Sequence, residues 1–305
     1  MCGLQEPVLA DRPAGEGSQS HGGRDPGGGR KSQEEGYRHP RFMTANEQVR
    51  LAKARVAREA PFVTPVRQAM VGFNRRINNL SVSTELAAEA AIAAAEGLRR
   101  EPEGAERYFA LPNAKGTEFL SPRTAGVMMS MLHRIGNREL LEHSLSLIVS
   151  ETERTLGEFV RLALTQNAEL LGTEKTVKLH RIFAAESLDE LRARLIHEQV
   201  QGLFFGRPSE YLSEIEKLLG VRLGKDMKLR YYELKATRDV CTHNAGRANE
   251  IYLAKAGELA RAFSGALVPV DADYLSKATT CVKRIVNHVG VSLQKKHGAE
   301  PLTLG

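Results

Sequence analysis

The chain has 305 residues, an apolar content of 42% and a formal net charge of +6. This length and composition allow a hydrophobic core in at least one domain, and no apolar stretch approaches the roughly 18 residues that a membrane span needs. The three cysteines, Cys2, Cys241 and Cys281, form no CxxC pair and leave an odd number. This pattern favours a reducing compartment, the cytoplasm, over secretion.

Residues 1–42 form a tail rich in Gly, Pro and charged residues. Because almost nothing in it can be buried, ordering it would cost backbone entropy without gain, and we expect it to be disordered. It has no apolar segment of the kind found in a signal peptide, and Met43 is an alternative to Met1 as the translation start.

The stretch 43–80 holds most of the excess positive charge, with seven basic residues against Glu47 and Glu59. A local basic excess can attract the phosphate backbone of a nucleic acid. The alternative is an ordinary solvated helix face. The candidate nucleic-acid contacts are Arg50, Lys53, Arg55, Arg58, Arg75 and Arg76.

Residues 43–120 are predicted to form a mostly helical N-terminal region. Good helix formers cover 46–60, which Pro61 ends, and 83–101, which finishes in basic residues that suit the negative end of a helix dipole. The stretch 106–121 instead predicts two short extended pieces around a turn at 112–116, which can pair as a hairpin.

Residues 121–298 predict an antiparallel helical bundle, which makes the fold class all-α. Ser121–Pro122 has the form of an N-cap followed by proline, and we expect the helix it opens to end at Gly136. One long amphipathic helix follows over 137–171. Its apolar stripe recurs at three- and four-residue steps: Leu141, Leu145, Ile148, Thr152, Leu156, Phe159 and Ala163.

Shorter helices complete the bundle. Ser187 with Glu190 forms a capping box that opens one, and Gly220 closes another that begins at Tyr211. Further helices are expected over 225–244, over 250–263, and from an N-cap at Asp273 to about residue 295. Asp271 and Asp273 have carboxylates suited to a divalent cation, but before a helix an aspartate is more often the cap.

Several catalytic motifs are absent from the sequence. His197–Glu198 is followed by Gln201 where a zinc-protease helix needs its second histidine, and the chain has no phosphate-binding loop and no G-x-S-x-G elbow. His288 stays without a role. We therefore predict no metal site and no cofactor.

The run "RDVCTH" is the motif that remains. Arg238 and His243 are five positions apart, so an ideal helix sets them roughly 140° apart around its axis. A site that uses both needs the helix to end near His243, which the C-cap sequence Asn244 to Gly246 predicts, or needs a second element or protomer. Arg238 also continues an apolar stripe, so we expect its guanidinium to lie partly out of bulk water, either snorkelling or paired with a glutamate of another helix.

These residues resemble the HEPN superfamily, and in particular its RiboL-PSP-HEPN branch. The resemblance rests on Arg238, the polar Asp239, three further residues and His243, followed by Asn244. It extends to "FFGRPSEYLSEIEKLLGVRL" upstream and "VDADYLSKATTCVKRIV" downstream, and covers about residues 137–296.

The resemblance implies a four- or five-helix bundle that forms a homodimer, with motifs of two protomers facing one groove, and metal-independent cleavage of RNA. In that chemistry a group that titrates near neutral pH, such as His243, moves the proton of the attacking ribose 2′-OH. A fixed cation, such as Arg238, stabilises charge on the phosphoryl oxygens. Asp239 and Asn244 match the polar positions beside them and would orient the imidazole or bind phosphate.

Two other classes of function compete with the nuclease. One is a non-catalytic helical partner or RNA-binding subunit of a toxin–antitoxin or phage-defence pair, because a fold does not fix a function. The other is a nucleic-acid binder that acts through 43–80 and keeps its function when His243 is lost. The intact Arg238–His243 run favours the nuclease over the non-catalytic subunit, because a pure scaffold has no need of both residues.

Overall fold

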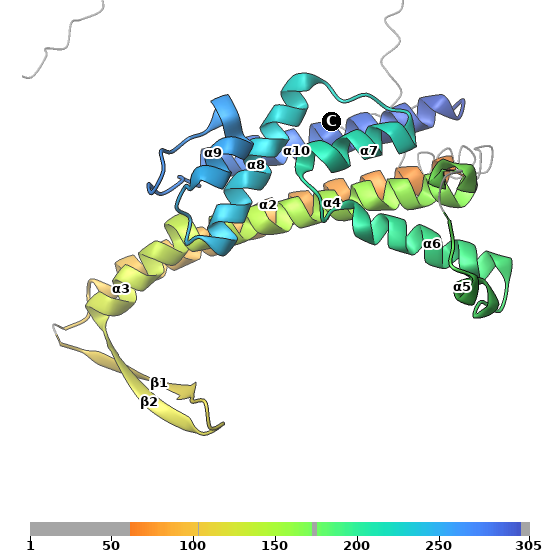
Figure 1. The fold of residues 1–305 in the computed structure, drawn as a ribbon. Helices are drawn as coiled ribbons and strands as arrows, with labels where there is room; N and C mark the ends of the chain where they lie inside the picture. The colour runs from red at the N-terminus through yellow and green to blue at the C-terminus, as the bar shows by residue number, and fades with distance from the viewer. Residues whose placement is uncertain (1–61, 103, 173–175, 300–305) are drawn as a thin grey trace, which may run out of the picture. The chain divides into compact units, whose positions relative to one another are not determined.

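The computed structural model describes residues 62–102, 104–172 and 176–299, all of which belong to one compact unit, Arg50–Gly305. Helices dominate the described residues, which confirms the all-α expectation (Figure 1). None of these helices is long and apolar enough to cross a membrane. The expected tail over 1–42 and the expected helix over 46–60 lie outside the described residues.

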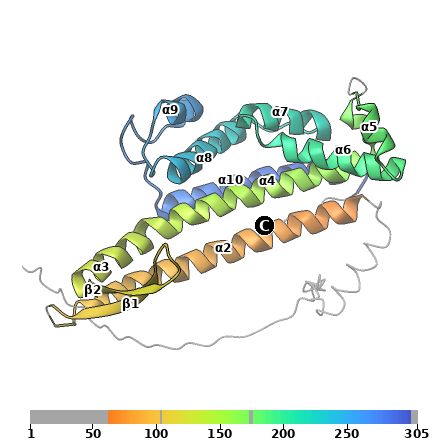
Figure 2. The ribbon, with the colours of Figure 1, turned by 60° about the horizontal axis from the view of Figure 1, so that its bottom comes forward.

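Three long helices form the centre of the unit: α2 (Val63–Leu98), α4 (Leu140–Gln166) and α10 (Ala272–Lys296). Each packs against the other two, and α2 runs antiparallel to both (Figure 2). One hydrophobic core joins them, and it crosses the expected domain boundary at residue 120, because α2 supplies Met70, Phe73 and Ile77. The predicted stripe of the long helix is buried along its whole length, as expected.

Helix α2 begins twenty residues before the expected start at Ser83. Its apolar residues Val66, Met70, Phe73 and Ile77 recur at three- and four-residue steps and are buried against the other long helices. Pro65 does not break the helix, because it lies in the first turn, where a backbone N–H has no acceptor within the helix.

The hairpin is confirmed. Strands β1 (Glu106–Pro112) and β2 (Glu118–Thr124) pair antiparallel, with Leu111 opposite Phe119, and the turn is closed by the Asn113 amide donating to the Thr117 carbonyl at 2.8 Å. The expected helix start at Ser121–Pro122 is wrong, because both residues belong to β2. Thr124 caps α3 (Ala125–Arg134) instead, its side chain accepting from the Val127 amide.

The expected helix end at Gly136 is also wrong. Helix α3 continues through the π-helical turn η1 (Ile135–Glu139) into α4. A Cβ atom on Gly136 would lie 2.9 Å from the carbonyl oxygen of Ala88, so the glycine serves a close approach to α2 rather than a stop signal.

The remaining helices cover one side of this centre. They are η2 (Ala168–Leu171), α5 (Leu179–Phe183), α6 (Leu188–Leu203), α7 (Pro208–Leu219), α8 (Lys225–His243), α9 (Glu250–Ala256) and η3 (Gly257–Leu259). Ser187 caps α6 and Gly220 ends α7 in the left-handed conformation, both as expected. The helix expected over 250–263 is shorter in the structure, because α9 ends before Gly257, which has φ of 55°.

The N-cap of α10 is Asp271, whose side chain accepts from the Tyr274 amide at 2.7 Å. The expectation that Asp273 is the cap is therefore wrong by two residues. Asp273 lies in the first turn and pairs with Lys277 on the exposed surface. The aspartate nearer the loop takes the cap because helical dihedrals begin at Ala272.

Candidate functional site

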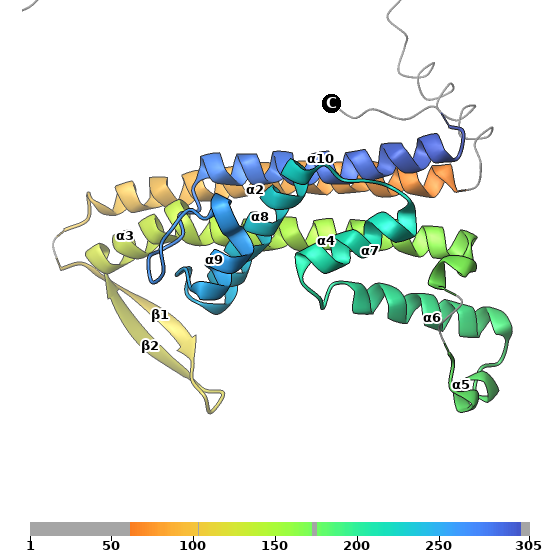
Figure 3. The same cartoon turned by 45° about the horizontal axis from the view of Figure 1, so that its top comes forward.

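Helix α8 lies across α4 and α10 and ends at the candidate site (Figure 3). The expected C-cap is present: the Asn244 and Gly246 amides both donate to the Val240 carbonyl at 2.9 Å. Ala245 and Gly246 have φ of 49° and 74°, a left-handed conformation that favours glycine at the second position. Arg138 fixes this end from the α3–α4 junction by donating to the Ala245 carbonyl at 3.1 Å.

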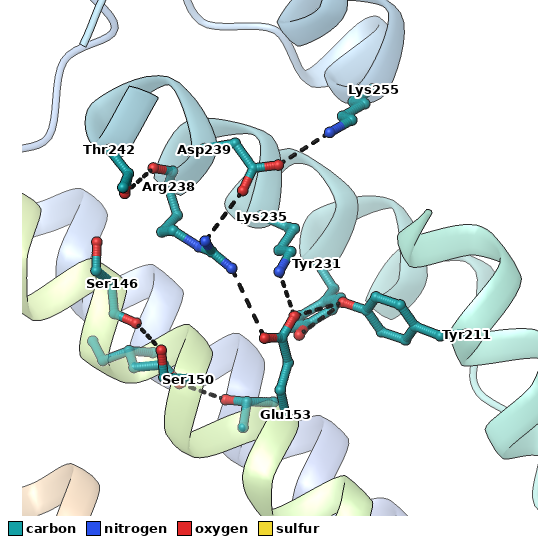
Figure 4. A network of polar contacts seen from close by, with 12 residues as sticks. Ser146, Ser150, Glu153, Tyr211, Tyr231, Lys235, Arg238, Asp239, Thr242 and Lys255 are labelled. Carbon is teal, nitrogen blue, oxygen red and sulfur yellow. Dashed lines mark hydrogen bonds and ion pairs between the residues drawn. The ribbon is translucent and has the colours of Figure 1, made fainter. Parts of the chain in front are cut away.

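Arg238 lies between α8 and α4, with its side chain 18% exposed (Figure 4). Its Nη2 is 3.8 Å from Glu153 Oε2 and its Nη1 is 3.4 Å from Asp239 Oδ1, whereas its Nε is buried and has no partner among the described residues. Two expectations for Arg238 are confirmed: its side chain is partly buried, and it faces a glutamate of another helix. Because both ion pairs are longer than a hydrogen bond, the two Nη groups keep capacity for another acceptor, whereas the unpaired Nε is buried.

Glu153 on α4 is the centre of this arrangement. It is 15% exposed, pairs with Lys235 and Arg238, and accepts a hydrogen bond from the Tyr211 hydroxyl at 3.3 Å. The Tyr211 and Tyr231 hydroxyl oxygens lie 3.1 Å apart, within hydrogen-bonding distance. Burial, with the nearby Glu153 charge as a further cause, raises the pKa of both tyrosines far above the usual range, so they remain neutral hydrogen-bonding groups.

Asp239 joins this arrangement to a pocket between α8 and α9. Its Oδ2 is 3.0 Å from Lys255 Nζ, and its Oδ1 faces Arg238. We call Glu153, Lys235, Arg238, Asp239 and Lys255 the Arg238 cluster. It has three cations and two carboxylates, and two of its members, Asp239 and Lys255, line the pocket.

His243 is exposed and lines this pocket, which has a volume of about 300 Å³. It lies one helical turn after Asp239, on the same side of α8. Asn244 and Lys255 line the pocket too, and Arg238 does not. The His243 ring makes no hydrogen bond to the described part of the chain, so both of its nitrogens are available to a ligand.

The structure thus brings three of the four predicted site residues, Asp239, His243 and Asn244, to one pocket. Arg238 reaches it only through Asp239, in agreement with the wide angle between positions 238 and 243. Sequence reasoning missed Glu153 and Lys255. Glu153 could have been found from its position, because it is an acid directly after Thr152, which belongs to the buried stripe of α4. No feature of the sequence near Lys255 indicates its role.

Cys241 lies inside the motif as a free, half-buried cysteine. Burial raises the pKa of its thiol to about 12, and the nearby Glu142 adds to the effect. A neutral thiol is a poor nucleophile and a poor metal ligand. No group of three or more His, Cys, Asp or Glu side chains with metal-binding geometry occurs within 62–102, 104–172 and 176–299.

A second buried polar cluster lies next to the first on α8. Glu233 accepts hydrogen bonds from Thr237 at 2.7 Å, from Arg261 Nε at 2.9 Å and from the Tyr274 hydroxyl at 2.9 Å. The Arg261 guanidinium also stacks 3.5 Å from the Tyr274 ring centroid and donates to Thr237 and to the Pro269 carbonyl. We call these four side chains, Glu233, Thr237, Arg261 and Tyr274, the Glu233 cluster.

The predicted nucleic-acid contacts are only partly within the described residues. Arg75 is exposed on α2, and Arg76 pairs with Glu151 of α4 at 2.6 Å. The two adjacent arginines therefore point in different directions. Arg50, Lys53, Arg55 and Arg58 lie outside the described residues.

Comparison with protein-family models, with curated proteins and with solved structures finds no match to this chain.

Proposed function

We propose that this chain is a metal-independent endoribonuclease of the HEPN type, with a HEPN-like bundle, whose reaction takes place at the pocket between α8 and α9. One observation supports it most: an exposed histidine, His243, shares a pocket with Asp239 and Lys255, and Arg238 lies directly behind them. A proton-transfer group beside fixed cations is what phosphodiester cleavage needs.

In the proposed reaction the ribose 2′ oxygen attacks the adjacent phosphorus while His243 takes the proton of the 2′-OH. The bond from phosphorus to the 5′ oxygen breaks, and this oxygen leaves with a proton from water. The products are a 2′,3′-cyclic phosphate and a 5′-OH end. Lys255, held in place by Asp239, and Arg238 of a second protomer stabilise the negative charge that develops on the phosphoryl oxygens.

The proposal includes a homodimer. Arg238 is absent from the lining of the pocket that holds His243, so a second protomer is the simplest way to present both groups to one phosphate. Mixing the inactive variants Arg238→Ala and His243→Ala tests this directly. Cleavage should return if each site takes Arg238 from one protomer and His243 from the other, and should stay absent if each protomer works alone.

We further propose a cytoplasmic protein that acts as a toxin or phage-defence effector, held in check by a cognate partner protein. The test of the activity is incubation of labelled RNA with EDTA. We expect cleavage of RNA, none of DNA, and none of an RNA with a single 2′-deoxy substitution at the cleaved position. Cleavage of the deoxy-substituted strand there would rule out attack by the 2′ oxygen.

A second candidate is a non-catalytic helical subunit that binds RNA or a partner protein. It is favoured by one observation, that Arg238 already faces two carboxylates, Glu153 and Asp239. This candidate predicts RNA binding without cleavage, and no change of binding in His243→Ala.

A further inference from the structure

The loop between α7 and α8 runs along the second half of α10, and the views in Figures 1 and 3 agree on this. Two contacts fix it there. Lys296 Nζ donates to the Leu219 carbonyl at 3.2 Å, and His288 Nε2 lies 2.8 Å from the Arg222 carbonyl oxygen. The loop and the outer face of α10 therefore form one continuous surface.

This surface is basic. Arg222 and Lys225 come from the loop and the start of α8, and Arg284, His288 and Lys296 recur on α10 at steps of four or eight residues. All five are exposed. We call these five residues the α10 basic surface. Within the described ranges, none of its arginines and lysines forms an ion pair with an acid.

The neighbouring acids are already paired with other cations. Glu216 binds Lys228 at 3.1 Å and accepts from the Leu223 amide, and Asp226 binds Arg230 at 2.9 Å. Neither carboxylate is left to neutralise the α10 basic surface. Its positive charge is therefore available to an outside anion.

We propose that the α10 basic surface binds the phosphate backbone of RNA, separately from the pocket at His243. Exposed arginines and lysines with little apolar area around them fit a nucleic acid better than a protein partner, whose interface usually has an apolar core. Leu229 is the one exposed large apolar side chain in 219–230, and 280–296 has none. This inference goes beyond cleavage and stands without it.

The α10 basic surface lies at the opposite end of α8 from His243. The 18 residue steps from Lys225 to His243 span about 27 Å at 1.5 Å per residue. An RNA that contacts both ends must be long enough to bridge this distance. Short oligonucleotides therefore reach the pocket without the affinity that the α10 basic surface adds.

The experiment is a salt titration of RNA binding by the full chain in EDTA, measured by fluorescence anisotropy. The probe is a single-stranded 2′-O-methyl RNA of roughly 20 nucleotides, which has no 2′-OH to attack the phosphate and is long enough to span both ends of α8. Each lost phosphate contact lowers the slope of log affinity against log salt by about 0.7 for a single strand. Arg222→Gln/Arg284→Gln should therefore lower the slope by about 1.4. The matched control is Lys277→Gln, which lies on α10 but pairs with Asp273.

Equal slopes for the parent and the double variant would overturn the proposal, as would an equal loss in the control. Polyglutamate that competes as well as RNA at the same charge concentration would also overturn it, because the surface would then select acidic chains in general. Repeating the titration in His243→Ala separates this proposal from the nuclease. A salt slope that still depends on Arg222 and Arg284 in this variant would support the surface independently of cleavage, whereas failure of the parent chain to cleave RNA in EDTA would reject the nuclease alone.

Discussion

Two polar clusters adjoin on α8, and each combines an arginine with a carboxylate, but they differ in how completely their groups are satisfied. In the Glu233 cluster the carboxylate accepts three hydrogen bonds, and Arg261 uses Nε, Nη1 and Nη2. In the Arg238 cluster the two arginine ion pairs are 3.4 and 3.8 Å long and Nε has no partner among the described residues.

The difference separates two uses of buried charge. A fully satisfied cluster fixes structure: the Glu233 cluster ties the segment after α9 to α8 and α10, and so sets the position of Lys255. An incompletely satisfied cluster beside a pocket keeps donors for a ligand. On this comparison, changes to the Arg238 cluster and its pocket should alter activity, and changes to the Glu233 cluster should alter stability.

The largest effect is expected at the pocket. His243→Ala should lower the rate of RNA cleavage by on the order of 10² to 10⁴, the usual contribution of a general acid or base. The variant should stay folded, because His243 is exposed and makes no hydrogen bond to the described residues. Cleavage rates at saturating RNA measure this. His180→Ala is the matched control, since His180 is also an exposed histidine, on α5, and the variant should cleave like the parent.

Arg238→Ala should lower the cleavage rate by roughly 10² to 10³, the range for loss of one transition-state charge contact. Its thermal unfolding midpoint should change little, since its ion pairs are long. The control is Arg230→Ala on the same helix, where the arginine pairs with Asp226 at the surface. If Arg238→Ala and Arg230→Ala cleave RNA at the same rate, Arg238 does not take part in catalysis.

Glu233→Ala should act on stability instead. Its side chain is 8% exposed, and its loss leaves Arg261 without a carboxylate. The free energy of unfolding should fall by about 3 kcal/mol, the lower end for breaking a buried pair, because Arg261 is itself 25% exposed. Urea unfolding measures this against Glu158→Ala, a surface pair with Arg161 that should cost less than about 1 kcal/mol. If the two variants unfold alike, the Glu233 cluster is not a structural anchor.

Asp239→Asn should have the smallest effect. Removing this charge frees Lys255 and Arg238, so RNA should bind more tightly. The expected gain is roughly threefold to fivefold, which corresponds to about 1 kcal/mol or less for partly exposed ion pairs. Anisotropy at low salt measures it, and the gain should shrink as salt rises. Asp273→Asn is the control, since its partner Lys277 lies away from the pocket. Weaker RNA binding in Asp239→Asn would contradict this prediction. It would mean that RNA binding needs the Asp239 carboxylate, either as a direct contact or to position Lys255 and Arg238.

The parts of the fold that local pattern decides were predictable. The buried stripe of α4, the hairpin turn and the caps at Ser187 and Gly220 each depend on residues a few positions apart. The role of Gly136 could not be predicted, because a glycine that ends a helix and a glycine that lets Ala88 approach have the same local sequence.

The candidate site divides in the same way. Arg238, Asp239 and His243 form one short run, so their spacing on the helix and the position of the helix end could be predicted directly from the sequence. Glu153 lies 85 positions before Arg238, and its role depends on how α8 crosses α4. Lys255 depends on where α9 turns back, which Ala245 and Gly246 set through their left-handed conformation.

The central claim is that the pocket at the end of α8 cleaves RNA without a metal, and the ends of the products test it most directly. RNA incubated with the full chain in EDTA should give 2′,3′-cyclic phosphate and 5′-OH ends, and His243→Ala should give neither while His180→Ala gives both. Products with 5′-phosphate and 3′-OH ends, or cleavage only after magnesium is added, would contradict the account.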